Sequence, residues 1–534
     1  MSDTSNDTLI QALQNEDLYD HPVSGFEVVE THISWIILAG EYAYKIKKPV
    51  NFGFLDFSSL ELRHKYCLEE VRLNRRYSPD LYLGVVAIHG TAVSPSFQDS
   101  GEAIEYAVKM KRFPGDQLLS RLSERDELTN RHIDAMAKAI AEFHETAGQC
   151  DGEDPFGAPS TVYRWAKENF EEIRPLLEDD DTLELLDRLE SWTDEQFTIK
   201  REFFEARKGG GFVRECHGDL HLGNMFAEDD RIRLFDCIEF NEELRRIDVI
   251  CEAAFVFMDL CDRGREEFAW RFLNHYLQQT GDYAGLHVLP WYVVYRALVR
   301  AKVILLRLSQ GHLTDAEREE IKRQCRGYME LAQRSTDRPS QLLVITRGLS
   351  GSGKSWLAEP LAGMLAAVHI RSDIERKRIH GYAMEAKTDS ELQKGIYSKH
   401  ADRSTYCHMA LVSADCIDAG YSVIVDATFL KQWQRDHFRT LAEDLDTGFV
   451  IIDLQVPVEL LRERVEQRQR SGEDVSEADT AVLDNQLSQQ EALTEEERRH
   501  ALEINAAGEP DWQAIVKALE ERRRPRDTVT EKRG

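Results

Sequence analysis

The segment 348–355 constrains this chain more than any other, because it reads G-L-S-G-S-G-K-S. It fits the pattern G-x-x-x-x-G-K-[S/T] at every fixed position, between an apolar run at 342–346 and a helix-like stretch from Trp356. In a strand–loop–helix setting, the backbone N–H groups of such a loop converge on phosphate oxygens. The helix N-terminus adds the positive end of its dipole. The segment therefore predicts a nucleoside-triphosphate site, in preference to a glycine-rich turn without function.

Each part of this loop has an expected role. Lys354 would reach the β- and γ-phosphates and act in catalysis, and Ser355 would place its hydroxyl on Mg²⁺. The backbone of the preceding residues would hold the phosphates; these residues are Gly348, Ser350, Gly351, Ser352 and Gly353.

Length and composition limit the remaining possibilities. With 534 residues the chain exceeds the size of one hydrophobic core. Its formal charge of -29 disfavours binding to nucleic acid or to anionic membranes. Nine cysteines without a C-x-x-C pair, and a polar N-terminus, favour a reduced, cytoplasmic compartment. The longest apolar stretch, 291–308, carries four basic residues, so we expect a buried helix rather than a membrane span.

Two lysines stand on one face of a predicted strand in the first half. In Y-A-Y-K-I-K, Lys45 and Lys47 alternate with apolar residues and point the same way. The helix that follows has an apolar stripe flanked by Glu69 and Glu70, and we expect Glu70 to point inward. A half-buried carboxylate requires a cation. The pattern leaves open which lysine pairs with which glutamate.

The chemical centre of the first half is the stretch 217–226, H-G-D-L-H-L-G-N-M-F, followed by a second strand that ends in Asp236. If these strands pair as a hairpin, Asn224 and Asp236 lie at the same open end and suit Mg²⁺. Asp219 would then lie beside a metal–triphosphate, where it could accept a proton from an attacking hydroxyl.

Two histidines of this stretch have a spacing that is also found between zinc ligands. His217 and His221 are four residues apart, but no third ligand is near in sequence and the glycines disfavour a helix there. We therefore favour no zinc. His144 lies on the apolar side of an amphipathic helix, where we expect a hydrogen-bonded core histidine.

On these residues, 26–330 resembles the aminoglycoside phosphotransferase family of small-molecule kinases, which has a protein-kinase-like fold. The matching motifs are H-G-D-x-x-x-x-N and F-D-C-I-E. The resemblance implies that Asp219 is the catalytic base and that Asn224 and Asp236 are Mg²⁺ ligands. It makes Lys45 the lysine that binds the ATP phosphates, and Glu70 its helix partner. No G-x-G-x-x-G precedes Lys45, which disfavours a protein substrate.

Three features of the second half indicate a kinase. Asp373 follows the second predicted strand, where it could deprotonate an acceptor hydroxyl while Arg376 binds an anionic part of that acceptor. Asp426 ends an apolar strand, the place of a carboxylate that orders Mg²⁺. Arg464 and Arg468 share a helix face before a loop at 471–474, so they could close over the transferring phosphoryl group.

The second half resembles the small P-loop kinases that include polynucleotide kinase and gluconate kinase. The match covers about 341–480 and rests on the loop itself, on S-D-x-x-R, on V-D-A-T, and on R-x-x-x-R followed by G-x-D-x-S at 472–476. It implies ATP as donor and Mg²⁺ as cofactor.

The predicted fold is a multidomain α/β and α+β chain. A two-lobed, protein-kinase-like domain precedes a P-loop NTPase domain with a parallel sheet. The predicted parts are a polar segment (1–25), the kinase-like domain (26–333), a linker (334–340), the P-loop domain (341–510) and a charged tail (511–534).

The leading hypothesis is a cytoplasmic ATP-dependent kinase that phosphorylates hydroxyls of small molecules at two ATP–Mg²⁺ sites. One alternative is a nucleotide-dependent regulator in which one or both sites only bind. Another is a 5′-hydroxyl kinase of nucleic acids, which the overall acidity disfavours and a local basic cluster favours; its members are Arg371, Arg376, Lys377 and Arg378. The sequence leaves open the acceptor, ATP against GTP, and the oligomeric state.

Overall fold

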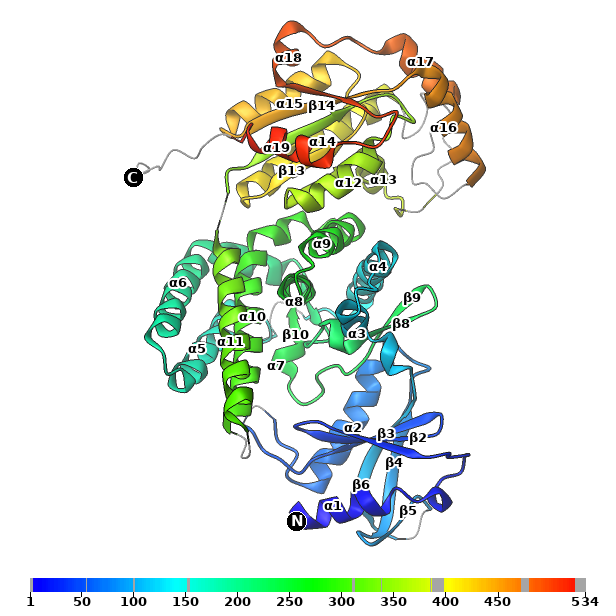
Figure 1. Cartoon of the computed structure of the whole chain (residues 1–534), viewed down its shortest axis with the longest axis vertical. Coiled ribbons are helices and arrows are strands. Elements are labelled where there is room, and N and C mark those ends of the chain that lie inside the picture. Colours follow the sequence, from blue (N-terminus) through cyan, green and yellow to red (C-terminus); the bar gives the residue numbers. More distant parts are fainter. Residues whose placement is uncertain are drawn as a thin grey trace. The chain divides into compact units, whose positions relative to one another are not determined.

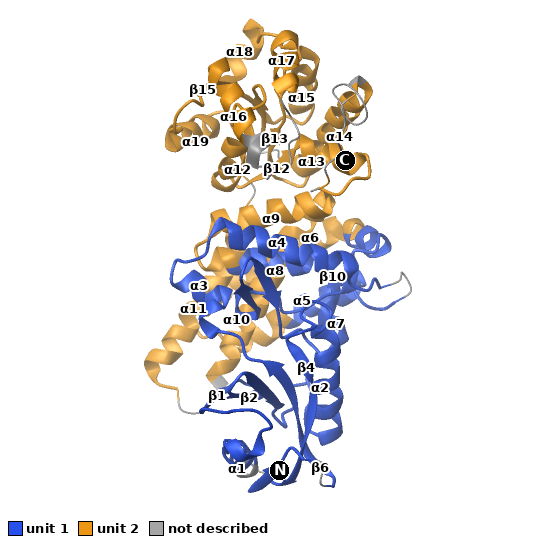
Figure 2. Ribbon diagram, turned by 90° about the vertical axis from the view of Figure 1, so that its right-hand side faces the viewer, with its two compact units in different colours: residues 1–168, 204–259 blue, residues 169–203, 260–534 orange. Residues whose placement is uncertain are grey.

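The computed structural model describes residues 3–53, 55–98, 101–150, 154–309, 313–337, 339–384, 386, 398–471 and 480–523. The chain forms two compact units, coloured separately in Figure 2. Unit 1 comprises residues 1–168 and 204–259, and unit 2 comprises residues 169–203 and 260–534. The predicted linker at 334–340 lies inside unit 2, so the division by contacts differs from the division by sequence, and the predicted boundaries stay a proposal.

Unit 1 contains an antiparallel six-stranded sheet in the order β1-β2-β3-β6-β4-β5 (Figure 1). Lys45 lies opposite Ile36 and Lys47 opposite Ser34, so both lysines lie on one face of β3, as predicted. Helix α2 (Leu60–Asn74) packs against β4 and β6 and buries Glu70. The strands are β1 (Phe26–Glu30), β2 (Ser34–Ala39), β3 (Tyr42–Lys47), β4 (Tyr82–Thr91), β5 (Ser94–Ser96) and β6 (Ala103–Lys111).

The N-terminal segment is more ordered than its sequence suggests. The polar sequence of 1–25 predicts a frayed or lightly packed stretch, but α1 (Asp3–Ala12) and η1 (Glu16–Leu18) form there. Leu9, Ile10 and Leu13 are buried in one core with residues of the sheet. The expectation was wrong because so few apolar residues give a weak helical pattern, whereas their burial depends on the distant sheet.

The predicted hairpin after the H-G-D motif is confirmed. β8 (Met225–Glu228) pairs antiparallel with β9 (Arg231–Leu234), with Met225 opposite Leu234. The surrounding elements are α4 (Asn130–Thr146), β7 (Val213–Glu215), η4 (Leu222–Asn224), α7 (Glu242–Arg245), β10 (Arg246–Asp248) and α8 (Val249–Asp262). Along the chain, η2 (Gly115–Gln117) and α3 (Leu119–Glu124) follow β6 and precede α4.

Unit 2 begins with helices that the predicted boundaries assign to the kinase-like domain. The predicted buried helix at 291–308 is confirmed in α10 (Leu289–Leu305), where Trp291 is buried. The other helices of this part are α9 (Glu266–Thr280), η5 (Tyr283–His287), η6 (Leu306–Ser309) and α11 (Asp315–Thr336). Helices α5 (Pro159–Ile173) and α6 (Asp180–Gly209), with η3 (Arg174–Leu176) between them, run across the division between the units.

The rest of unit 2 is a parallel five-stranded sheet in the order β12-β13-β11-β14-β15. The sequence predicts four of its strands, at 342–346, 368–370, 422–427 and 449–456. It does not predict the fifth, at the edge, because A-L-E-I-N alternates apolar and polar residues only briefly. The strands are β11 (Leu342–Arg347), β12 (Ala367–Arg371), β13 (Ser422–Asp426), β14 (Gly448–Gln455) and β15 (Ala501–Asn505). The helices are α12 (Lys354–Met364), α13 (Ser372–Ile379), α14 (Lys399–Asp418), α15 (Gln432–Asp444), α16 (Val458–Ser471), α17 (Thr480–Gln489), α18 (Glu495–His500) and α19 (Trp512–Glu520).

Candidate active sites

In unit 1, both candidate lysines bind the same buried glutamate. Lys45 Nζ donates to Glu70 Oε1 at 2.9 Å and Lys47 Nζ donates to Glu70 Oε2 at 2.6 Å. Lys45 also contacts Asp236, and Lys47 contacts Glu239. Burial raises the pKa of Glu70, but the two lysines outweigh it and hold that pKa below its usual value. The sequence left the pairing open; the structure pairs Lys45 and Lys47 jointly with Glu70.

The H-G-D loop and the hairpin bring the other predicted residues together. Asn224 Nδ2 donates to Asp219 Oδ2 at 3.1 Å and to the Asp219 backbone carbonyl at 2.8 Å. Asp236 follows β9 with a φ of 67°, a left-handed conformation that is costly for a residue with a side chain. Gly218 has a φ of 90°, and a Cβ there would lie 2.8 Å from the Leu244 carbonyl oxygen. Only glycine therefore fits this point of the loop.

His217 connects the loop to the hairpin. Its Nδ1 accepts from the backbone N–H of Asp219 at 3.4 Å, and its Nε2 lies 2.8 Å from the carbonyl oxygen of Phe235. Burial lowers the pKa of His217, which suits a neutral ring that donates at one nitrogen and accepts at the other. His221 Nδ1 accepts from the backbone N–H of Gly223 at 3.0 Å. Both histidines thus have structural partners.

A buried acid that sequence reasoning missed orders the loop. Glu252, on α8, accepts from the backbone N–H groups of His217 at 2.8 Å and of Gly218 at 2.6 Å. Its other oxygen lies 2.9 Å from His144 Nε2, so the predicted hydrogen-bonded core histidine is confirmed. Asp259, about two turns further along the same side of α8, accepts from the backbone N–H of Leu222. The signal was present: these are isolated acids in the apolar run V-I-C-E-A-A-F-V-F-M-D-L.

Glu252 also belongs to a trio with the spacing of metal ligands. Among the described residues, ligand atoms of His144, Cys216 and Glu252 lie within 4.8 Å of one another. Burial raises the pKa of the Cys216 thiol well above its usual value, which opposes the thiolate form that a metal would need. The trio fits the ordering of the loop better than it fits a metal.

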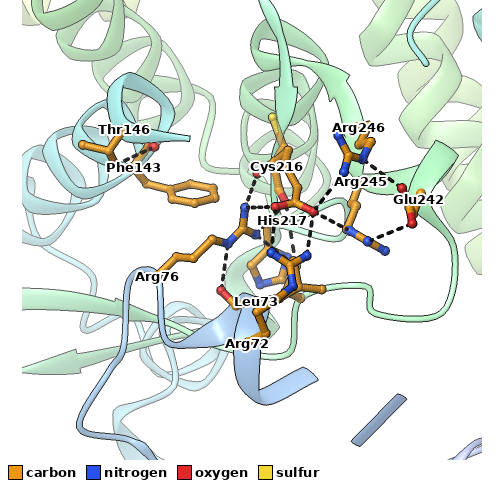
Figure 3. Close-up of polar contacts among 12 residues, drawn as sticks. Arg72, Leu73, Arg76, Phe143, Thr146, Cys216, His217, Glu242, Arg245 and Arg246 are labelled. Atoms are coloured by element: carbon orange, nitrogen blue, oxygen red, sulfur yellow. Dashed lines mark hydrogen bonds and ion pairs between the residues drawn. The ribbon is translucent and has the colours of Figure 1, made fainter. Parts of the chain in front are cut away.

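An arginine cluster ties α2 to the strand before the loop. Arg72 of α2 and Arg76, which lies in the turn just after α2, converge there with Arg245 and Arg246 in Figure 3. All four contact the carboxylate of Glu215: Arg72 at 2.7 Å, Arg76 at 3.3 Å, Arg245 at 3.4 Å and Arg246 at 3.7 Å. Because α2 also carries Glu70, the cluster fixes the helix that orients the lysines against the loop that carries Asp219.

Replacing Glu215 with glutamine is expected to lower the stability of unit 1 by about 1–3 kcal/mol at neutral pH, because charge-assisted hydrogen bonds to the arginines are weakened. Burial raises the pKa of Glu215, but the arginines lower it to about 2 from 4.5. Its contribution is therefore complete above pH 4.5 and is lost as the pH falls toward 2. The free energies of unfolding of the wild type and the variant should become equal below about pH 2. They are measured by urea denaturation, which is monitored through hydrogen exchange in peptides of unit 1.

The matched control for this prediction is Glu228→Gln. Glu228 is half-exposed and lies 3.6 Å from Arg233, a surface pair whose loss should cost less than about 1 kcal/mol. If Glu215→Gln is as mild as Glu228→Gln at every pH, the cluster does not stabilise the unit.

In unit 2, the glycine-rich loop has the expected strand–loop–helix setting between β11 and α12. Gly351 and Gly353 have φ values of 83° and 87°, which favour glycine. Ser355 Oγ donates to Asp426 Oδ2 at 2.5 Å, so the predicted metal ligands of this half lie together. A hydroxyl and a carboxylate are oxygen ligands of the kind Mg²⁺ prefers, and the pair fits that ion. Lys354 Nζ donates to the Leu349 carbonyl at 2.9 Å.

Asp426 is fully buried at the end of β13. Burial raises its pKa, but His369, Arg371 and the Ser355 hydroxyl lower it to about 2. The carboxylate therefore stays ionised at neutral pH, the form that binds a cation.

The predicted acceptor residues lie on α13, which follows β12. Asp373 is in the first turn of that helix and is partly exposed. Arg376 is buried and donates to Asp402 Oδ1 at 2.9 Å, so its predicted anion-binding group already has a carboxylate partner. Glu375 accepts from Tyr283 of η5 at 2.9 Å and contacts His408 of α14 at 3.0 Å, which fixes the helix.

Of the two arginines predicted to close over the phosphoryl group, Arg464 has a side chain that the structure describes, whereas Arg468 does not. Arg464, on α16, donates to the carbonyl of Ala506 at 3.0 Å and of Gly351 at 3.5 Å, so it faces the glycine-rich loop. Arg468 is in the same helix, but its side chain and residues 472–479, with the G-x-D-x-S motif, lie outside the described part of the chain. Across that described part, no helix has the length and apolar character to cross a membrane.

Two protein families match separate parts of the chain. Residues 63–289 match the phosphotransferase enzyme family and residues 343–493 match an AAA domain. The chain therefore joins a phosphotransferase-family region to a P-loop kinase-like region, and these matches support phosphotransferase activity.

The chain belongs to the family of an uncharacterized protein of Mycobacterium tuberculosis (strain ATCC 25618 / H37Rv). The two are 30% identical over 466 residues, which cover 87% of this chain and 91% of the relative. A protein of Mycobacterium bovis matches to the same extent.

Solved structures with similar folds include two kinases. The amicoumacin kinase hAmiN, in complex with AMP-PNP, Ca²⁺ and Ami, is 15% identical; the match covers 61% of this chain and 92% of that chain, with a TM-score of 0.39. A gluconokinase from Sinorhizobium meliloti 1021 is 23% identical over 34% of this chain and 90% of its own, with a TM-score of 0.24.

Proposed function

We propose that this protein is a cytoplasmic ATP-dependent kinase with one ATP–Mg²⁺ site in each half, and that it phosphorylates hydroxyl groups of small molecules. The observation that carries the proposal is two separate clusters, in each of which residues predicted to bind phosphate and metal lie together. In one, Lys45 contacts both Glu70 and Asp236. In the other, Ser355 follows Lys354 and donates to Asp426.

In the first site, Lys45 binds phosphate oxygens of ATP, and Glu70 holds that lysine in place. Asp219 accepts the proton of the acceptor hydroxyl as that oxygen attacks the γ-phosphorus. Asn224 and Asp236 hold Mg²⁺; their amide and carboxylate oxygens suit the ion. Mg²⁺, when bound, neutralises charge on the phosphates.

In the second site, the backbone of the loop at 348–353 and Lys354 bind the phosphates, and Ser355 with Asp426 holds Mg²⁺. Asp373 takes the proton of the acceptor hydroxyl. Arg376 exchanges its carboxylate partner for an anionic group of the acceptor. Arg464 and Arg468 stabilise charge on the transferring phosphoryl group. The predicted domain boundaries, 26–333 and 341–510, belong to the same proposal.

The test is ADP release by the full chain with ATP, Mg²⁺ and a panel of acceptors: sugars, aminoglycosides, nucleosides and 5′-hydroxyl oligonucleotides. At least one small molecule is expected to raise ADP release and to be recovered as a phosphate ester. If only the oligonucleotides do so, the acceptor class is wrong. If no acceptor raises turnover while ATP still binds, the protein is a nucleotide-dependent regulator.

A further inference from the structure

The parallel sheet of unit 2 ends at β12, and a helix completes its open edge. An edge strand presents unpaired backbone N–H and C=O groups. Asn274 of α9 donates to the Ala367 carbonyl at 3.0 Å and accepts from the His369 N–H at 2.7 Å. Gln278, one turn further along α9, donates to the His369 carbonyl at 3.0 Å. Both amide side chains are buried, and α9 thus binds both the N–H and the C=O of His369 at this edge.

The ring of His369 points at the candidate metal site. Its side chain is 3% exposed, and its Nε2 lies 3.6 Å from Asp426 Oδ2. Nε2 has no hydrogen-bond partner within the described residues. Arg371, two residues along the strand and thus on the same face, has its Nε 4.0 Å from the same oxygen. Ser355 donates to that oxygen at 2.5 Å, so a hydroxyl, the ring of His369 and the guanidinium of Arg371 all lie within 4.0 Å of Asp426 Oδ2.

We propose that His369, fixed by Asn274 and Gln278 of α9, is a positioning residue for Asp426, so that α9 is a working part of the second nucleotide site. The inference rests on the proposed function of that site. A buried carboxylate needs a fixed arrangement of donors and cations to keep one orientation. α9 belongs to the region matched to the phosphotransferase family, whereas the loop and Asp426 belong to the AAA match. His369 therefore links the metal site of one half to a helix of the other.

A purely structural role makes a different prediction. If Asn274 and Gln278 only seal the sheet edge, their loss lowers stability and weakens nucleotide binding equally with and without Mg²⁺. If they position Asp426 through His369, the loss falls on the part of the affinity that Mg²⁺ provides. The readout is therefore the ratio of the nucleotide affinity with Mg²⁺ to the nucleotide affinity without it, rather than activity.

The experiment measures how a nonhydrolysable ATP analogue protects peptides of residues 348–355 from hydrogen exchange in the full chain, with Mg²⁺ and with EDTA. This readout is specific to the second site. His369→Ala is expected to reduce the Mg²⁺ enhancement about 10–100-fold, as for other partners of metal ligands. His369→Gln, which can still donate toward Asp426, should recover most of it, and Asn274→Ala should give an intermediate loss.

His287→Ala is the matched control. His287 is a buried histidine of unit 2 whose Nε2 lies 2.9 Å from Asp415 Oδ1. Its loss should lower the thermal midpoint and leave the Mg²⁺ enhancement unchanged. A wild-type Mg²⁺ enhancement in His369→Ala overturns the role of His369, and in Asn274→Ala it overturns the role of α9. Absence of protection in the wild type would instead overturn the proposed function of the site.

Discussion

Asp219→Asn is expected to lower kcat at the first site by about 10²–10⁴-fold, the usual contribution of a general base. Nucleotide affinity should change little, because Lys45, which we propose binds the phosphates, and Glu70, which holds that lysine, are untouched. The loop should also keep its shape: an asparagine oxygen can still accept the hydrogen bond that Asn224 donates to Asp219. The measurement is phosphate-ester formation under saturating ATP with an acceptor found in the panel.

The control for this variant is Asp229→Asn, the same chemical change in the β8–β9 turn. Asp229 is exposed and has a φ of 52°, a conformation that asparagine tolerates. It should match the wild type in kcat. Undiminished transfer by Asp219→Asn to every acceptor would show that Asp219 is not the base.

Lys354→Ala is expected to lower kcat/KM of the second site by at least about 10²–10³-fold, because the proposed role of Lys354 is both to bind the phosphates of ATP and to stabilise charge in the transition state. The fold should persist, because alanine is a strong helix former at the start of α12. Transfer that depends on Asp219 should be unaffected. The readout is phosphate-ester formation with each active acceptor, compared between Lys354→Ala and Asp219→Asn.

Lys517→Ala provides the matched change on an exposed face of α19. It should behave as the wild type toward every acceptor. If Lys354→Ala also behaves as the wild type, the P-loop does not support transfer to those acceptors. If both variants at Lys354 and Asp219 abolish the same reaction, the halves act on one step and the account of two separate sites is wrong.

Local patterns predicted those parts of the fold and sites that depend on neighbours in sequence. The G-K-S loop needs only a strand before it and a helix after it, and the structure has both. The hairpin that follows Asn224 needs only a short turn. The direction of Glu70 followed from the apolar stripe of its own helix.

Partners that are far apart in the sequence were beyond such patterns. Glu70 has two lysines because β3 presents both on one face, and no spacing rule chooses between them. Glu252 orders the H-G-D loop from 35 residues away, and a lone acid in an apolar helix was its only trace. His369 sits in the strand A-V-H-I-R, where nothing local indicates that α9 holds its backbone or that Asp426 lies beside its ring.

The most direct test of the central claim is the number of nucleotides that one chain binds. Calorimetric titration with a nonhydrolysable ATP analogue and Mg²⁺ should give two molecules per chain for the wild type and one for Lys354→Ala. Replacement of Lys45 with alanine should also give one, leaving the site at the P-loop. A stoichiometry of one for the wild type, unchanged in either variant, would contradict the account of two nucleotide sites.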